Sequence, residues 1–207
     1  MIEVVQTKSL LPAIKWNGNF ICSSIDPMLE AQKWVDKNKT RIIRQKQVIV
    51  LGVGCGHHLV ALQKNFPGLH ILAVDVQNEF IQFAQREHAL ELSNVVFVNA
   101  HTANSFKSNP RLLSALNSRY AVLVFAPAHQ KASALYMEFE ELLLGRTDAG
   151  ANFLCQVRKE LSSLLTGRHV KVASDSLISI KTLDGAIVQE TNENMVLKIK
   201  ILKEMIN

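Results

Sequence analysis

The sequence predicts an α/β fold built on a doubly wound, mostly parallel sheet. Two features of the chain lead to this class. Residues 47–51 and 69–74 are short apolar runs without alternation, which is typical of strands covered on both faces. Segments with helical spacing of apolar residues separate such runs, and strands that alternate with helices form parallel sheets. We therefore expect Val48–Leu51 to be the central strand, parallel to Ile71–Val74.

The expected elements follow in chain order. Asn17 and Gly18 form a turn signal and predict a hairpin. Asp26 and Pro27 predict the start of a helix that runs to about Asn38, because aspartate caps a first turn and proline is tolerated there. The remaining elements are expected as strands at 47–51, 69–74, 95–98 and 121–125, and as helices at 57–66, 78–90, 109–117 and 130–144.

The C-terminal quarter is expected to complete the same domain. Asp184 and Gly185 predict the turn of a C-terminal β-hairpin. The expected elements there are helices at 151–165 and 192–206 and short strands at 170–173, 177–182 and 186–189. The chain thus divides into an N-terminal segment with a lead-in helix, 1–46, and one α/β domain, 47–207.

Composition favours a globular protein with a sizeable core, because 48% of the residues are apolar and 20% are charged. The sequence shows no signal-peptide core and no apolar run of the roughly 20 residues that a membrane helix needs. We expect a cytoplasmic protein without membrane contact. Cys22, Cys55 and Cys155 are odd in number and widely spaced, which predicts neither a disulfide framework nor a metal site.

Positive charge gathers in one run before the first central strand. The net charge is +5, and the run holds Lys37, Lys39, Arg41, Arg44 and Lys46. Such a run could contact nucleic acid, or it could be a solvated helix end whose cations suit the helix dipole. Aromatic residues that would stack on bases are not interleaved with it. We therefore do not expect a nucleic-acid partner.

The string VIVLGVGCGHH carries the clearest chemical signal. It places Gly52, Gly54 and Gly56 between a strand and a helix, where the chain turns sharply and a ligand can approach the backbone. The dinucleotide fingerprint GxGxxG fails, because His57 stands at its sixth position. The spacing GxGxG resembles the first motif of class I S-adenosylmethionine-dependent methyltransferases. That resemblance implies a Rossmann-like, nucleotide-binding domain whose loop approaches the methionine part of the cofactor.

Asp75 strengthens the nucleotide hypothesis. It ends the second strand, 19 residues after Gly56, and an acid near that spacing can accept both ribose hydroxyls. Asn99 ends the third strand, where adenine contacts often lie in this fold. The expected cofactor-binding residues are Gly52, Gly54, Gly56, Asp75 and Asn99, with S-adenosylmethionine as the cofactor. The alternative is a scaffold without ligand, in which the glycines only turn the chain and Asp75 binds the start of the next helix.

No catalytic residue can be assigned from the sequence. Residues 125–128 end the fourth strand without the acid or amide that amino-methylating families often carry before proline. His58 could point into the cofactor cleft or donate a ring N–H to the backbone. His129 could act as a base.

A second resemblance covers roughly residues 10–145. The strings NGNFICSSIDPMLEAQKW, GVGCGHHL and AVLVFAPAHQKASALYMEFEELL resemble the motility accessory factors, which are bacterial flagellin glycosyltransferase-like proteins related to an archaeal 6-hydroxymethylpterin pyrophosphokinase-like group. Ser23, Asp26 and Pro27 match that family's Ser-x-x-Asp-Pro segment, and His57 stands at the aromatic position of its glycine loop. The family's transferase chemistry lies in a following domain with a glycine- and proline-rich motif, and these 207 residues contain no such motif. Glycosyl and pyrophosphate transfer are therefore not expected.

Three functions remain open at this point. The first is an S-adenosylmethionine-dependent methyltransferase with an unknown acceptor. The second is a non-catalytic Rossmann-like binding module with a protein partner. The third is an accessory protein linked to nucleotide-sugar chemistry or flagellin glycosylation. The fold alone does not choose among them.

Overall fold

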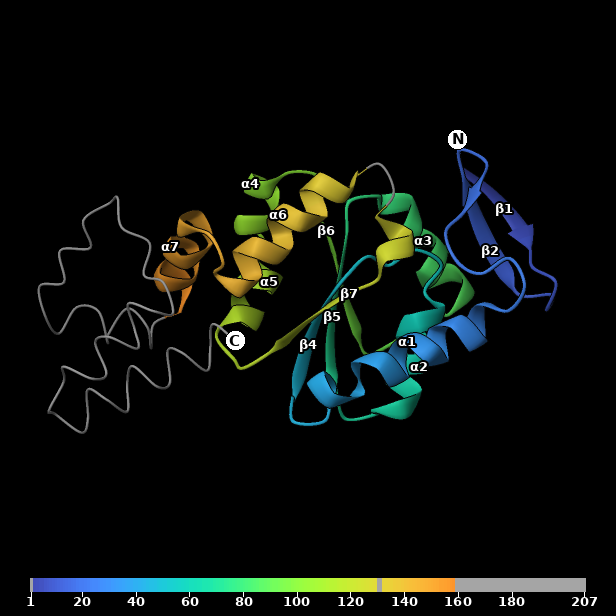
Figure 1. Ribbon diagram of the computed structural model, residues 1–207, viewed down its shortest axis with the longest axis horizontal. Helices are drawn as coiled ribbons and strands as arrows, with labels where there is room; N and C mark the ends of the chain where they lie inside the picture. The colour runs from blue at the N-terminus through green and yellow to red at the C-terminus, as the bar shows by residue number, and fades with distance from the viewer. Residues whose placement is uncertain (1, 130–131, 159–207) are drawn as a thin grey trace, which may run out of the picture. The chain divides into compact units, whose positions relative to one another are not determined.

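The computed structural model describes residues 2–129 and 132–158 (Figure 1). The chain divides into two compact units, residues 1–140 and 141–207. The expected hairpin at Asp184 and Gly185, the strands between 170 and 189 and the helix at 192–206 lie outside the described residues, as does the part of helix 151–165 beyond residue 158.

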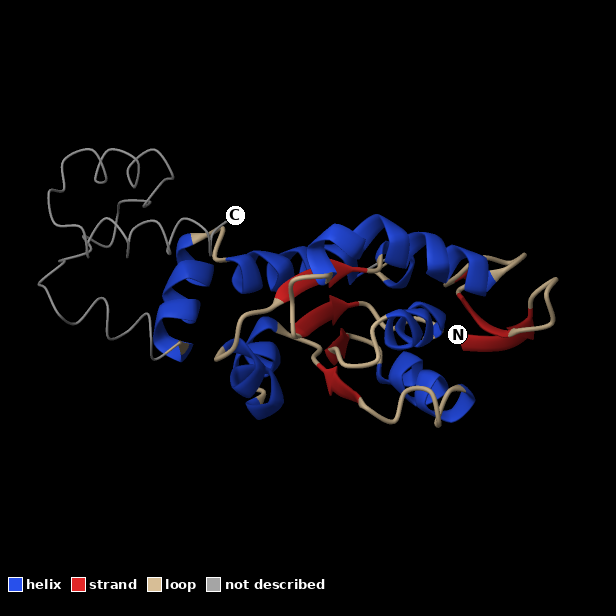
Figure 2. Cartoon of the chain, turned by 90° about the horizontal axis from the view of Figure 1, so that it is seen from below, coloured by secondary structure: helices blue, strands red, loops and turns tan. Residues whose placement is uncertain are grey.

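A four-stranded parallel sheet forms the centre of the first unit. Its strands are β4 (Gln47–Leu51), β5 (His70–Asp75), β6 (Val95–Asn99) and β7 (Ala121–Val124), in the order β6-β5-β4-β7. The register pairs Val48 with Ile71 on one side and with Ala121 on the other. Val48 to Leu51 are fully buried, and helices lie on both sides of the strands (Figure 2). The predicted parallel α/β sheet, with 48–51 as an inner strand beside 71–74, is confirmed.

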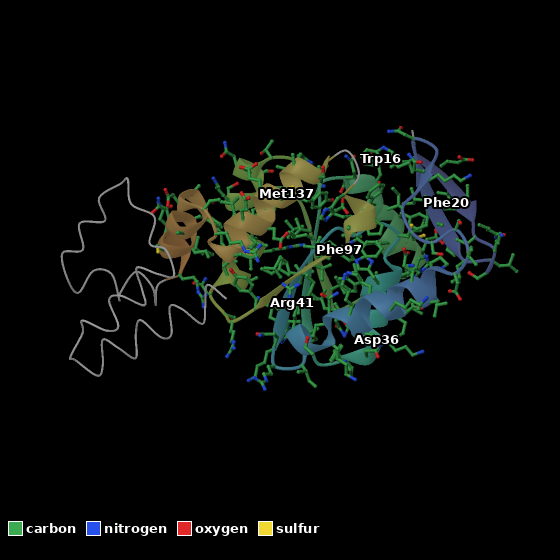
Figure 3. The ribbon with its side chains drawn as sticks, in the orientation of Figure 1. Trp16, Phe20, Asp36, Arg41, Phe97 and Met137 are labelled. Atoms are coloured by element: carbon green, nitrogen blue, oxygen red, sulfur yellow. The ribbon has the colours of Figure 1, made fainter. Side chains whose placement is uncertain are left out.

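A small antiparallel sheet precedes the parallel one. It contains β1 (Ile2–Gln6), β2 (Pro12–Trp16) and β3 (Asn19–Phe20) in that order. Asn17 and Gly18 have φ of 51° and 82°, as the tight turn of a twisted hairpin requires. The hairpin predicted at this turn is therefore confirmed, whereas β1 was not predicted. The ring of Trp16, which is labelled in Figure 3, packs edge-on against Phe80, with 5.5 Å between ring centroids.

Helix α1 (Pro27–Ile42) begins where the sequence predicts, because the Asp26 side chain accepts from the backbone N–H of Leu29. The expected end near Asn38 is too early by four residues. Val35 and Ile42 extend one buried face along the whole helix, and burial of Ile42 holds the last turn. The Trp34 indole N–H donates to the Val124 carbonyl oxygen at 2.8 Å and ties α1 to β7.

The other helices of this unit lie between the parallel strands or follow the last of them in the chain. They are α2 (His57–Asn65), α3 (Asn78–Glu87), α4 (Ala103–Lys107), α5 (Pro110–Leu116), the 3-10 turn η1 (Ala126–Ala128) and α6 (Ser133–Leu144), whose last residues belong to the second unit. Helix α3 ends three residues earlier than expected. Helix α4 was not predicted; Thr102 and Ser105 form a reciprocal capping box at its start.

In the second unit, α7 (Asp148–Val157) begins three residues before the predicted start at 151. The Thr147 hydroxyl caps it by accepting from the backbone N–H of Gly150 at 3.1 Å. A Cβ at Gly150 would lie 2.6 Å from the carbonyl oxygen of Glu141. Glycine therefore permits the close contact between the start of α7 and the end of α6.

Candidate functional site

The glycine loop connects the carboxyl end of β4 to α2. Gly52, Gly54 and Gly56 all have positive φ, at 100°, 49° and 83°. L-residues with a side chain rarely adopt this conformation, so the loop requires glycine for its path alone. The turning role that the sequence predicts for these residues is present.

The protein's own atoms approach the loop where glycine leaves room. A Cβ at Gly52 would lie 2.8 Å from the Phe125 carbonyl oxygen, and one at Gly54 would lie 3.0 Å from Cγ2 of Ile21. Phe125 follows β7 and Ile21 follows the N-terminal sheet. Two distant segments therefore pack directly over the glycines.

Asp75 ends β5 and is fully buried. Its Oδ2 accepts from the backbone N–H of Val53 at 2.6 Å and of Gly54 at 3.3 Å. Its Oδ1 accepts from the backbone N–H of Gln77 and from the Tyr136 hydroxyl, both at 2.8 Å. The carboxylate thus holds together the glycine loop, the start of α3 and α6.

Burial raises the pKa of Asp75 from 3.8 to about 6, against the opposing effect of the hydrogen bonds from Gln77, Val53, Tyr136 and Gly54. Burial, together with the charge of Asp75, raises the pKa of Tyr136 well above its usual value. At neutral pH the acid is therefore ionised and the tyrosine keeps its proton, so all four contacts run from a donor to the carboxylate.

Asn99 lies beside Asp75 at the carboxyl edge of the sheet, paired with it in register. Its side-chain amide donates to the carbonyl oxygens of Asp75 at 3.0 Å and Val76 at 3.2 Å. The structure therefore brings all the predicted cofactor residues to the carboxyl edge of the sheet. Through its two hydrogen bonds, the Asn99 side chain holds the segment between β5 and α3.

His57 and His58 begin α2, and both are buried. Nε2 of His57 lies 2.9 Å from the Pro12 carbonyl oxygen, and Nε2 of His58 lies 3.0 Å from that of Gly52. A carbonyl oxygen only accepts, so each Nε2 carries the proton and each Nδ1 keeps a lone pair. Burial lowers the pKa of His57 to about 4 and that of His58 to about 3. Of the two alternatives for His58, the structure has the ring N–H donating to backbone.

Aromatic rings fill the space beyond the loop. The His58 ring stacks on Phe125, with 3.8 Å between centroids and 4° between planes. The His129 ring stacks on Tyr136 at 3.9 Å, and its Nε2 donates to the Leu51 carbonyl oxygen at 3.2 Å. Tyr136 was not foreseen as a site residue. It lies 61 residues after Asp75 in an apolar helix, and no local pattern marks it.

A small cavity adjoins the loop, and it is too narrow to hold a water molecule. Its lining comes from the segment before α1, α1 itself, the glycine loop, α2 and the residue after β7: Cys22, Pro27, Glu30, Ala31, Cys55, Gly56, His57, His58 and Phe125. Ligand pockets usually measure about 300–1,000 Å³, so this cavity is far too small for a nucleotide. Asp75 does not line it.

The basic run has an ordinary structural setting. Lys39 and Arg41 stand in the last turn of α1, where positive charge suits the helix dipole, and Arg41 is labelled in Figure 3. In the ranges 2–129 and 132–158, no helix is long and apolar enough to cross a membrane. In those same ranges no cluster of three or more His, Cys, Asp or Glu side chains is placed to hold a metal ion.

Comparison with known proteins adds no family to this picture: no protein-family model matches the chain, and no curated protein matches it at significant similarity. The two resemblances drawn from its motifs therefore stay predictions.

Proposed function

We propose that this chain is a non-catalytic binding module with a Rossmann-like sheet, whose glycine loop is closed by its own side chains. One observation carries the proposal: both oxygens of the Asp75 carboxylate already accept two hydrogen bonds each from the protein. A ribose could bind there only by displacing two of these donors. Hydrogen bonds to charged groups are worth about 1.5–3 kcal/mol each, so that exchange gains little.

The packing over the loop supports the same proposal. Ile21 and the Phe125 backbone occupy the space that glycines leave in a nucleotide-binding loop. Moving them outward would also separate Phe125 from His58 and from Trp34, whose ring centroid lies 6.0 Å away. A cofactor would therefore have to open part of the apolar core before it reached the loop.

Three exposed apolar side chains in the N-terminal part of the chain suit a protein partner. Leu10, Ile25 and Leu29 are exposed by 76%, 59% and 52%. The backbone N–H of Ser9 donates to the Ile25 carbonyl oxygen, so the segments that carry Leu10 and Ile25 run side by side. Leu10 also has a φ of 61°, an uncommon conformation for a bulky residue and one that is enriched at functional sites. Exposed apolar side chains on neighbouring segments are a common feature of interaction surfaces.

The methyltransferase remains the second candidate. The observation in its favour is that the glycine loop, Asp75 and Asn99 converge at the carboxyl ends of adjacent parallel strands. Open α/β sheets bind their ligands at that edge. The third candidate, an accessory protein of nucleotide-sugar chemistry, rests on the resemblance alone.

Calorimetric titration and thermal shift distinguish these candidates. We expect neither heat of binding nor a change in melting temperature with S-adenosylmethionine, S-adenosylhomocysteine or a nucleotide panel at millimolar concentration. A ligand that binds only the native state would raise the melting temperature. The methyltransferase would replace our proposal if either adenosyl compound raised the melting temperature of the protein. In that case, Asp75→Asn should remove the rise in melting temperature, whereas the exposed Asp36→Asn should retain it.

A further inference from the structure

We infer that Cys22 and Cys55 form a reversible disulfide that joins the segment before α1 to the glycine loop. The two thiols are neighbours: both side chains belong to the same buried apolar cluster and line the same small cavity, and Cys55 is the main cause of the raised pKa of Cys22. Both cysteines are free and buried in the structure. This inference goes beyond the proposed function and does not depend on it.

The position of each cysteine gives the link a structural consequence. Cys22 directly follows Ile21, whose side chain covers Gly54. Cys55 lies between Gly54 and Gly56, and its sulfur accepts from the backbone N–H of Ile14 at 3.3 Å. A bond between the two sulfurs would fasten the N-terminal sheet and the Ile21 cover to the loop.

The reaction needs a two-electron thiol oxidant, for which we name a small-molecule disulfide. A thiolate of the pair attacks that disulfide, forms a mixed disulfide and releases one small thiol. The second cysteine then attacks the protein-bound sulfur, forms the Cys22–Cys55 bond and releases the other small thiol. Two protein thiols and one disulfide thus become one protein disulfide and two small thiols, and a dithiol reverses the exchange.

The surroundings of the pair predict a slow exchange. The contact with Cys55, burial, and the charges of Cys55 and Glu30 all raise the pKa of Cys22. Thiolate is the reactive form and is therefore scarce at neutral pH. His57 and His58 also line the cavity but are neutral at that pH, so they supply no positive charge to stabilise a thiolate. We expect oxidation over hours, during brief openings of the N-terminal segment.

The test is peptide mapping of the full chain. The Cys155→Ser variant is incubated with oxidised glutathione, its remaining thiols are alkylated, and the chain is digested without reduction. We expect a cross-linked peptide pair containing Cys22 and Cys55, an intact mass lower by two hydrogens, and reversal by dithiothreitol. The cross-link lowers the conformational entropy of the unfolded chain, so the melting temperature should rise by about 5–10 °C.

Single variants serve as controls. Cys22→Ser and Cys55→Ser, each in the Cys155→Ser background, should lose both the cross-linked peptide and the rise in melting temperature. The mapping in the Cys155→Ser background does not depend on whether these two variants fold. The inference is overturned if Cys22 and Cys55 remain alkylatable after prolonged oxidation, or if they carry only glutathione and no bond to each other.

Discussion

Asp75 binds groups of this protein itself with the carboxylate that the sequence predicts to accept a ribose. Its four donors come from the glycine loop, the start of α3 and α6. A buried acceptor of this kind stabilises only while every donor stays aligned with it. The residue is therefore central to stability, whether or not a ligand ever reaches the loop.

Replacing Asp75 by asparagine should destabilise the fold. The asparagine amide group would face a backbone N–H or the Tyr136 hydroxyl, and a buried donor left without an acceptor costs about 1–3 kcal/mol. Urea unfolding of Asp75→Asn should show a loss of that size. The matched control is Asp36→Asn on the exposed face of α1, which should change the free energy of unfolding by less than about 0.5 kcal/mol. Equal effects at the two positions would contradict this account of Asp75.

The two buried histidines at the start of α2, His57 and His58, predict that the fold loses stability in acid. Their Nδ1 atoms are buried without a hydrogen-bond partner, so a proton there would create a donor with no acceptor. The pKa of His57 falls from 6.5 to about 4 and that of His58 to about 3. A lowered folded-state pKa contributes stability that is complete above pH 6.5 and is lost as the pH falls toward 4 and 3.

The pKa shift of Asp75 affects stability in the opposite direction over an overlapping pH range. Its pKa rises from 3.8 to about 6, so its contribution favours the fold below pH 3.8 and is lost as the pH rises through 6. The pKa shifts of the two histidines, added together, are more than twice as large as the pKa shift of Asp75. We expect the free energy of unfolding to fall by about 2–3 kcal/mol from pH 7 to pH 5.

Urea titrations at the two pH values measure this difference. His58→Gln should reduce the dependence on pH, whereas the exposed His101→Gln should leave it unchanged. A protein equally stable at pH 5 and pH 7 would show that the buried histidines do not govern its acid response.

At the scale of elements, the sequence predicts best where one local rule decides. Residues 48–51 are apolar without alternation, which is typical of a short strand covered on both faces. Asp26 and Pro27 likewise mark the start of α1. The end of α1 was placed too early because burial of Ile42 against distant segments, rather than a local signal, sets it. Strand β1 escaped prediction because it lies at a sheet edge and buries none of its residues fully.

Gly56 shows how tightly the first helix of the site is packed. It caps α2 in the left-handed conformation, and a Cβ there would lie 2.9 Å from Cβ of Ala84 on α3. Gly56→Ala should therefore lose about 2–4 kcal/mol through backbone strain and overpacking together. Gly68→Ala is the matched control, because nothing lies within 4 Å of its Cβ position. Differential scanning calorimetry should show a lower melting temperature for Gly56→Ala alone, and equal melting temperatures would refute the packing argument.

At the scale of the whole molecule, the site depends on contacts that no single segment of the sequence reveals. The positions of Gly52, Gly54 and Asp75 follow from motif spacing and from the topology of a parallel sheet. Ile21, Phe125 and Tyr136, which close the loop, come from three separate parts of the chain. Their apolar or aromatic character fits any core position, so only the folded structure shows that they meet here. Residues 1–46, expected as a lead-in segment, belong to the same compact unit as the parallel sheet.

That shared unit predicts cooperative unfolding of the two sheets. Trp16 lies on β2 and packs edge-on against Phe80 of α3, while Trp34 lies on α1 and donates to the carbonyl oxygen of Val124. Replacing a buried tryptophan by alanine typically costs about 3–5 kcal/mol, and the partly buried Trp16 should cost somewhat less.

Trp16→Ala leaves Trp34 as the only tryptophan, so its fluorescence reports on the parallel sheet alone. Loss of the N-terminal contact should shift the Trp34 unfolding midpoint to lower urea, together with the circular dichroism signal. The exposed Val4→Ala on β1 should move neither signal, and an unchanged Trp34 midpoint in Trp16→Ala would mean that the antiparallel sheet folds independently of the parallel one.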